Sequence, residues 1–357
     1  MENFGSWSIL TTNFLIVLYL ALNGVTLAAV LHLVNGKWRF KIRHIAVSMS
    51  ALFPLAFVLL ILVLANGEHT FTWVAAAAHG GHGDAEHHLS GWLNYDFLVA
   101  RQVIGFFIIA GIYTLFIKWQ HESDIDSSYA AQRRFRNIAL LIPFFYFVYG
   151  TMVAWDFEMT QDPLWHSASY GVYHFQSNFH MFLAFFTILL FFLNRAGCLE
   201  KEIEPKIFNY MAQFMLAMTI LWTYFYFTQY LIMWYARLPM EMARFDAMMY
   251  NGFAPLWWTF LTLKFVIPLT VLVINPNRHN PPVIMAVACC ILLGSWIERY
   301  TWIAGSVDPA DYHMPMSSFV DIALTALIIG AGYCLVRFAM LRYGVIKRKT
   351  EVEVKVE

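Results

Sequence analysis

Long apolar stretches alternate with short polar segments along the whole chain. Runs of about 20 apolar residues match the hydrocarbon thickness of a bilayer, and a scan for them predicts about nine spans. These spans lie near residues 10–34, 44–66, 96–118, 137–156, 173–194, 208–235, 252–274, 281–304 and 317–341. The pattern therefore predicts an all-α polytopic membrane protein, with residues 1–357 forming a single membrane domain.

The composition agrees with this prediction. Hydrophobic residues make up 60% of the 357 residues and charged residues only 13%, which is more apolar surface than a soluble domain can bury. The formal net charge is zero, so nothing in the charge balance favours nucleic acid as a partner. The four cysteines form no CxxC or CxxCH motif, so we expect no iron–sulfur cluster and no covalent haem in this chain.

The sign of the charge alternates between successive connections. The segments GKWRFKIRH, QRRFRN, NRAGCLEKEIEPK, NPNRHNPP and RYGVIKRK are basic, whereas residues 67–95, 157–172 and 305–316 carry acids and histidines. Because basic connections stay in the cytoplasm, we expect a periplasmic N-terminus and a cytoplasmic C-terminus, with residues 344–357 as a charged cytoplasmic tail. The first span follows no basic segment, and we interpret it as a retained helix rather than a signal peptide.

A histidine-rich tract, AAAAHGGHGDAEHH, lies in the longest outer connection. Four of its histidines could collect a metal ion: His79, His82, His87 and His88. The glycines between them give no fixed geometry, so we interpret the tract as a solvated loop rather than a metal site.

Polar residues inside the predicted spans are informative, because each costs free energy unless it is paired or faces water. Most of them fall in the outer third of the spans: Asp96, Arg101, Asp156, Gln176, His180, Gln229, Glu298, Arg299 and Asp321. A single such residue at a helix end fits an interfacial anchor equally well. Together they predict a proton-handling or ligand-binding layer beneath the outer surface, with Asp96, Arg101, Arg299 and Glu241 as a charge layer.

Lys264 is the single charge in LWWTFLTLKFVIPLTVLVIN. Counted from Gly252, it lies about 18 Å into its helix and near the bilayer midplane. In one interpretation its stem packs among aromatic rings and its amine bonds a carbonyl freed by Pro268. In the other, Lys264 carries protons, because burial disfavours the charged amine. We predict a proton path through six residues: Lys264, Gln213, His180, Glu298, Asp321 and Asp156.

His180 also raises the question of a b-type haem, which needs a second histidine at similar depth on a facing helix. The other span histidines are expected at the cytoplasmic ends (His32, His44 and His279) or at the outer edge (His174 and His313). We therefore expect His180 to be hydrogen-bonded, in a structural or a relay role. Gln176, four residues earlier, is expected to fix its tautomer.

Four segments carry a family resemblance: DFEMTQDPLWHSASYGVYHFQSNF, FTQYLIMWYARLPMEM, APLWWTFLTLKFVIPLTVLV and LLGSWIERYTWI. They resemble the ActF-type membrane subunit of bacterial alternative complex III, in the NrfD-like superfamily. The resemblance implies two four-helix bundles beside one peripheral first helix. Residues 1–195 would then hold the peripheral helix and the first bundle, and residues 196–343 the second bundle. Two departures are a missing second acid before Glu241 and about nine spans where the family commonly has ten.

The resemblance also implies a location in the bacterial inner membrane and a set of partners. These are an ActC-type paralogue, an iron–sulfur subunit and c-haem subunits, which hold the redox centres, with lipids and menaquinol or ubiquinol nearby. The chain is then expected to be a subunit without its own redox centre in a quinol:electron acceptor oxidoreductase. It would support assembly and proton translocation. A secondary transporter is the alternative, and a haem-containing cytochrome b or a structural anchor are further hypotheses.

Overall fold

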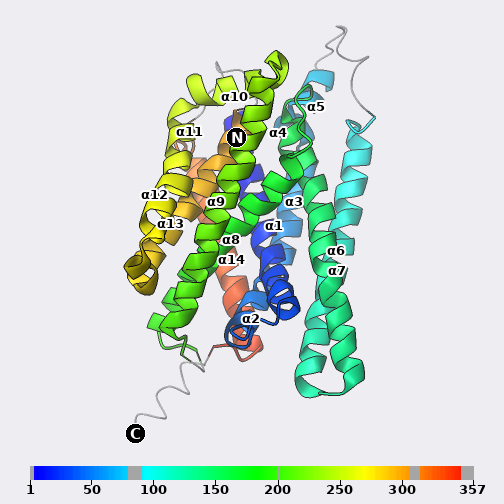
Figure 1. Cartoon of the computed structure of the whole chain (residues 1–357). Helices are drawn as coiled ribbons and strands as arrows, with labels where there is room; N and C mark the ends of the chain where they lie inside the picture. Colours follow the sequence, from blue (N-terminus) through cyan, green and yellow to red (C-terminus); the bar gives the residue numbers. More distant parts are fainter. Residues whose placement is uncertain (1–3, 79–90, 200–201, 306–313, 347–357) are drawn as a thin grey trace.

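The computed structural model describes residues 4–78, 91–199, 202–305 and 314–346, and the long helices in these ranges run side by side (Figure 1). In chain order the helices are α1 (Phe4–Leu33), α2 (Arg39–Val47), η1 (Ser48–Leu52), α3 (Phe53–Ala65), α4 (Gly67–Thr70), α5 (Thr72–Ala78), α6 (Tyr95–Ile125), α7 (Tyr129–Phe157), η3 (Met159–Gln161), α8 (Tyr170–Arg195), α9 (Pro205–Tyr235), α10 (Pro239–Tyr250), α11 (Ala254–Leu261), η4 (Thr262–Val266), α12 (Ile267–Val273), η5 (Asn275–His279), α13 (Pro281–Ala304) and α14 (Phe319–Arg342). The histidine tract at 79–88 lies outside the described residues.

Eight helical segments of the described chain are long and apolar enough to cross a membrane, which confirms an all-α polytopic membrane protein. They are Phe4–Leu33, Arg39–Ala65, Tyr95–Ile125, Tyr129–Gln161, Tyr170–Arg195, Ala254–Val273, Pro281–Ala304 and Phe319–Arg342. The helix α9 spans 31 residues beside them but carries many tyrosines and tryptophans, which lower its mean hydropathy. The predicted count of nine spans therefore requires α9 to cross as well, and it stays a prediction.

The first helix, α1, lies at the centre of the molecule. Of its most apolar 18-residue window, 89% is buried by the rest of the protein, the highest share among the eight segments. A Cβ atom on Gly24 would lie 2.2 Å from the carbonyl oxygen of Ala46, so only glycine allows α2 to approach this closely. The predicted peripheral position of the first helix is wrong, because its apolar residues cover the whole circumference and pack on every side.

The last helix, α14, is the most exposed segment, with 17% of its window buried. It packs against α1 and η1, and the side-chain amide of Asn13 on α1 donates to the Thr325 hydroxyl on α14 at 2.9 Å. The helix α8 packs against α7, α9, α13 and α1. The two halves of the chain thus share contacts through α1 and α8, and their division into two four-helix bundles stays a prediction.

The connections sort into two ends of the molecule (Figure 1). One end, which we call the α2 end, holds α2, the α6–α7 turn, the α8–α9 and α12–α13 connections and the end of α14. Ion pairs join its parts: Arg43 to Asp124 at 2.5 Å and Lys41 to Glu204 at 3.2 Å. The opposite end, the α10 end, holds α4, α5 and α10. All five basic segments lie at the α2 end, as far as the structure describes them.

Candidate functional site

Lys264 lies in a π-helical turn, η4, between α11 and α12. Pro268 explains this turn, because it lacks the N–H that would pair with the Lys264 carbonyl in a regular α-helix. The N–H of Ile267 bonds the Thr262 carbonyl instead, five residues earlier. The turn touches α13 at Gly294, where an added Cβ would lie 2.9 Å from Leu263 Cβ and 3.3 Å from the Lys264 amide nitrogen. The Lys264 side chain is fully buried.

Glu298 on α13 is the partner of Lys264. It lies four residues after Gly294, on the same helix face, and the Lys264 amine donates to its Oε2 and, at 2.5 Å, to the Ser177 hydroxyl. Ser177 also donates to Glu298 Oε2 at 2.8 Å. The other oxygen, Oε1, accepts from the Tyr173 hydroxyl and, at 2.7 Å, from the Trp222 indole. The buried carboxylate is thus held by one cation and three neutral donors.

A second buried carboxylate, Glu158, lies at the end of α7 and is held by Arg299 of α13. One guanidinium nitrogen of Arg299 donates to both Glu158 oxygens, at 2.6 and 2.5 Å. The Tyr170 hydroxyl donates to Glu158 Oε2 at 2.5 Å. A second nitrogen of Arg299 lies 3.9 Å from Glu298 Oε2. Arg299 therefore joins the two carboxylates into one buried charge network.

His174 extends the network toward α1. Arg299 donates to its Nδ1 at 2.7 Å, and its Nε2 lies 2.8 Å from the Tyr19 hydroxyl, which donates to the Gly150 carbonyl at 3.3 Å. Nδ1 also lies 3.0 Å from Glu158 Oε2, a carboxylate oxygen that can only accept, so Nδ1 faces both a donor and an acceptor. His174 thus links the Arg299–Glu158 pair to Tyr19.

We call these residues the charge network: Lys264, Glu298, Arg299, Glu158, His174, Ser177, Tyr170 and Tyr173. The charged members are at most 1% exposed. Two carboxylates face one ammonium and one guanidinium, so the charges balance. Such a set is tolerated in an apolar interior only because every ion is paired and hydrogen-bonded. Because the partners can also donate and accept protons, the arrangement can store and pass a proton without exposing an unpaired charge.

Aromatic rings enclose the charge network on the side of the α10 end. Arg244 of α10 donates to the carbonyls of Glu158 (2.7 Å) and Trp302 (2.8 Å), and its guanidinium lies over the rings of Trp165 and Trp302 at 4.6 and 5.1 Å. The Trp302 indole donates to the Tyr173 hydroxyl at 2.9 Å. These contacts link the short helix α10 to the charged interior.

A separate buried ion pair joins α6 and α7. Arg101 donates to both oxygens of Asp156, at 2.8 and 2.7 Å, and the Trp92 indole donates to Asp156 Oδ1 at 2.8 Å. The Gln102 amide donates to Oδ2, and the Arg101 guanidinium lies 4.1 Å from the centre of the Trp92 ring. Asp156 therefore closes the hairpin of α6 and α7 and holds the segment before α6. Within the described residues it forms no hydrogen bond or ion pair with the charge network.

The structure brings some of the residues predicted from the sequence together and separates others. Lys264, Glu298 and Arg299 meet in the charge network. Arg101 and Asp156 form the separate pair. Asp96 is exposed in the first turn of α6, and Gln213 is exposed on α9, where its amide donates to Asn209 Oδ1 at 3.3 Å. The predicted step from Lys264 to Gln213 is therefore wrong, because Gln213 lies on the outer face of α9.

His180, Glu241 and Asp321 lie on three different helices, α8, α10 and α14. His180 is buried one turn below Ser177, and its Nε2 lies 3.2 Å from the Thr219 hydroxyl, whereas Gln176 donates to the Met218 carbonyl. The predicted Gln176–His180 contact is thus replaced by a contact with α9. Glu241 is half-buried in the first turn of α10, where its carbonyl accepts from the Trp165 indole at 2.9 Å. Asp321 is fully buried in the first turn of α14.

The interpretation in which the Lys264 amine bonds a carbonyl freed by Pro268 is not what the structure has, since the amine bonds side chains. Glu158, Tyr170, Tyr173 and His174 were not among the predicted site residues. The sequence pattern placed Glu158 in an outer connection and His174 at the outer edge. A signal was present in the spacing of Tyr170, Tyr173, His174 and Ser177, which puts four polar groups on one face of the helix.

Within the described residues, no three His, Cys, Asp or Glu side chains are grouped to hold a metal ion. The ionic groups of the charge network are already paired with one another. No protein-family model matches the chain, and no curated protein matches it either.

Proposed function

We propose that this chain is the proton-handling membrane subunit of a respiratory quinol:electron acceptor oxidoreductase of the alternative complex III type. In this proposal it lies in a bacterial inner membrane and carries no redox centre of its own. The c-type haems and iron–sulfur clusters belong to partner subunits, which include an ActC-type paralogue, and quinol binds nearby. The observation that supports the proposal best is the fully buried, charge-balanced network around Lys264 and Glu298.

The network has the properties that a proton relay requires. Lys264, Glu298, Glu158 and His174 are all groups that can bind and release protons. Hydrogen bonds join Lys264 to Glu298, and a second set joins Glu158 and His174 to Arg299 and, through Tyr19, to α1. The two sets meet at the 3.9 Å ion pair between Arg299 and Glu298. A proton that moves from Lys264 to Glu298 would leave two neutral partners in the same place, which costs less than separating the charges. Electron transfer in a partner subunit could drive this step by changing the nearby electric field.

A secondary transporter is the second candidate, and one observation favours it. The helix that holds Lys264 is interrupted by the π-turn η4 and by Pro268, and interrupted helices beside buried charges are typical of transporter binding sites. The two candidates differ in what the isolated chain does. A transporter moves a solute in proteoliposomes without partners, whereas the proposed subunit needs electron transfer through its complex.

Purification from the native membrane tests the proposal first. We expect the chain to copurify with subunits that contain c-haem and iron–sulfur clusters, and to show no visible absorption band when it is expressed alone. A stoichiometric b-haem spectrum from the isolated chain, or purification without redox partners, would contradict the proposal.

The proton role is tested in the assembled complex. The double substitution Lys264→Met with Glu298→Gln removes both charges together, so the interior stays balanced. We expect quinol oxidation and haem content to persist while the number of protons released per electron falls. Gln213→Leu, on the outer face of α9, is the matched control and should leave this ratio unchanged. An unchanged ratio in the assembled double variant would contradict the relay.

A further inference from the structure

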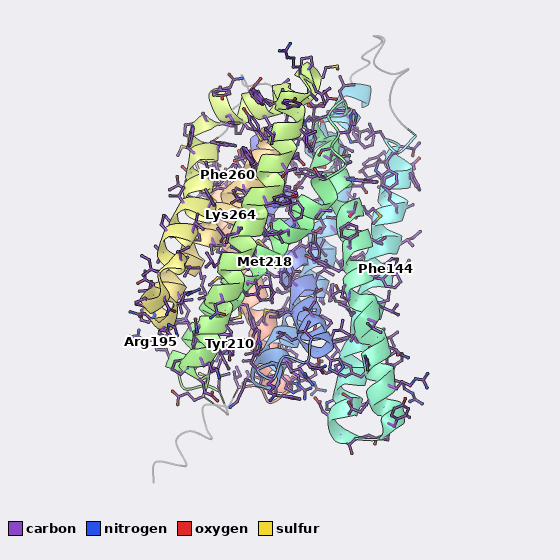
Figure 2. All side chains as sticks on the ribbon, viewed as in Figure 1. Phe144, Arg195, Tyr210, Met218, Phe260 and Lys264 are labelled. Atoms are coloured by element: carbon purple, nitrogen blue, oxygen red, sulfur yellow. The ribbon has the colours of Figure 1, made fainter. Side chains whose placement is uncertain are left out.

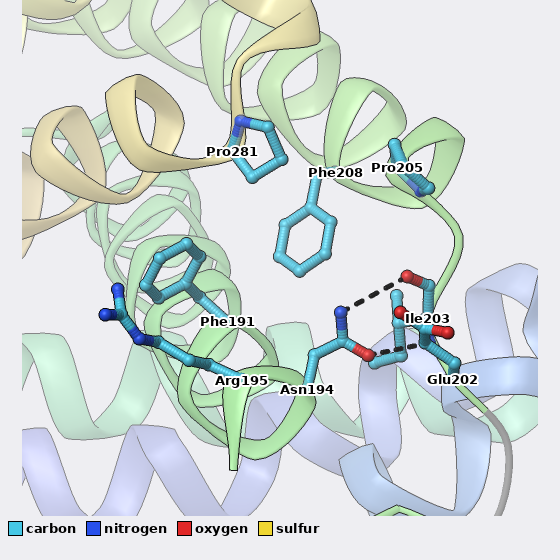
Figure 3. Close-up of a pocket in the computed structure, with 8 residues that line it drawn as sticks. All are labelled: Phe191, Asn194, Arg195, Glu202, Ile203, Pro205, Phe208 and Pro281. Atoms are coloured by element: carbon cyan, nitrogen blue, oxygen red, sulfur yellow. Dashed lines mark hydrogen bonds between the residues drawn. The ribbon is translucent and has the colours of Figure 1, made fainter. Parts of the chain in front are cut away.

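A pocket of about 310 Å³ lies at the α2 end, between the end of α8 and the starts of α9 and α13 (Figure 3). Its wall is largely apolar: Phe191, Phe208, Ile203, Pro205 and Pro281. The rings of Phe191 and Phe208 meet edge to face, with 6.4 Å between their centroids. The pocket lies where three helices begin or end, which is the depth at which a bilayer changes from acyl chains to headgroups.

The polar groups of the pocket differ in whether they already have a hydrogen-bond or ion-pair partner. The Asn194 amide is already used, since it accepts from the Ile203 N–H at 2.9 Å and donates to the Ile203 carbonyl at 3.4 Å (Figure 3). Arg195, in the last turn of α8, is exposed at the rim and forms no ion pair among the described residues. Glu202 lies on the opposite side of the pocket from the Arg195 guanidinium (Figure 3). Within the part of the chain that the structure describes, Arg195 is thus a cation without an ion-pair partner beside an apolar cavity.

The surroundings of the pocket add positive charge. Lys206 lies in the first turn of α9, and Arg278 lies in η5, which packs against α9. The nearby acid Glu204 is paired with Lys41 at 3.2 Å. A ligand that fits an apolar wall with a cationic rim at this depth is an amphiphile with an anionic head. Basic pockets between membrane helices bind such headgroups.

We propose that this pocket binds one anionic phospholipid, with its phosphate at Arg195 and an acyl chain against Phe191 and Phe208. The lipid would connect the ends of α8, α9 and α13, two of which carry the charge network further along their length. The proposal does not depend on the proposed function, because it rests on the pocket, its apolar wall and the charge at its rim.

Thermal unfolding of the purified chain, or of its complex, in mixed micelles tests the proposal. We expect added phosphatidylglycerol to raise the Tm in a saturable manner and phosphatidylcholine with the same acyl chains to raise it less. Arg195→Gln should weaken the apparent affinity for phosphatidylglycerol about fivefold, the effect of one basic residue near an anionic surface. Arg195→Lys, which keeps the charge, should retain most of the affinity.

Arg133→Gln is the matched control, because it removes the same charge from an exposed arginine at the same end but outside this pocket. It should leave the phosphatidylglycerol response unchanged. Native mass spectrometry should find one retained anionic lipid on the wild-type chain and fewer on Arg195→Gln. Three results would each overturn the proposal: equal responses to the two lipids, an equal loss in Arg133→Gln, or the same Tm shift with inorganic phosphate alone.

Discussion

Glu298 shows how a carboxylate can remain charged inside an apolar protein. The Lys264 amine balances its charge, and three neutral donors occupy its remaining acceptor positions. An ion in a dry interior is costly, and a pair offsets this cost only with good geometry and further hydrogen bonds. Removing one partner is therefore far more damaging than removing both, because it leaves an uncompensated charge.

This asymmetry gives a first prediction on stability. Lys264→Met should lower the free energy of unfolding by about 3–5 kcal/mol, because Glu298 loses its counter-ion. Adding Glu298→Gln should restore a large part of this loss. Chemical denaturation in detergent, analysed as a double-mutant cycle, measures both effects.

Lys118→Met is the control for the first prediction. Lys118 lies on a predicted span too, but its side chain is 65% exposed and faces Glu122 one turn away. Its replacement should change the stability by less than about 0.5 kcal/mol. Equal losses of unfolding free energy at Lys118 and Lys264 would show that the buried pair stabilises the protein no more than an exposed pair does.

At the residue scale the sequence singles out Lys264, Glu298 and Arg299, which the structure buries together, because an ionisable residue within an apolar run is rare and conspicuous. It does not predict Glu158, which lies in the acidic connection 157–172 and whose burial depends on α8, α10 and α13 closing around it. It also overrates Gln213, because the helix face that α9 turns outward is set by tertiary packing.

At the scale of single elements, α13 and the interrupted helix α11–η4–α12 depend on each other. Gly294 lets the π-turn approach α13, and this approach brings Lys264 to Glu298, one turn further along α13. Figure 2 labels Lys264 on the side of the interrupted helix that faces α9. The sequence shows Pro268 in this helix, but a proline alone does not indicate whether the helix bends, ends or widens into a π-turn. The partner helix decides between these outcomes.

Gly294→Ala should therefore push α13 and the π-turn η4 apart. The added methyl group would overlap Leu263 Cβ, so we expect a loss of about 1–3 kcal/mol in stability, as for other overpacked sites. Because the strain falls on the turn that carries Lys264, the loss should be smaller in a Lys264→Met, Glu298→Gln background. Differential unfolding measurements of the four variants would detect this coupling.

Gly330→Ala is the matched control for Gly294→Ala, because Gly330 also lies inside a helix but has open space where its Cβ would be. There the gain in helix propensity, up to about 1 kcal/mol, should leave the protein equally stable or more stable. A comparable loss of stability at both positions would mean that the effect comes from the detergent or the assay and not from the contact between α13 and η4.

At the scale of the whole molecule the buried ionic side chains are distributed unevenly between the two ends. Glu298 lies six residues before the end of α13, or about 9 Å from it, and Glu158 directly follows the last residue of α7. The charge network is thus nearer to the α10 end. Toward the α2 end the centre is apolar, with Leu183, Phe186 and Leu190 of α8 packed in the main hydrophobic core. The sequence predicted this layer from the positions of polar residues in the spans, although it misplaced α1.

The orientation of the molecule in the membrane can be tested with a native residue. Cys198 lies in the α8–α9 connection at the α2 end, where the basic segments gather, and we expect this end to face the cytoplasm. A membrane-impermeant maleimide should therefore label Cys198 in inside-out vesicles and not in intact cells or right-side-out vesicles. Cys198→Ser should abolish the labelling at this end, and Asp246→Cys in that background, at an exposed position on α10, should be labelled only from the opposite side. Labelling of Cys198 from outside would show that the topology is the reverse of the expected one. The charge network would then lie nearer the cytoplasm. A proton released from it would leave the membrane on the cytoplasmic side, which contradicts the proposed role.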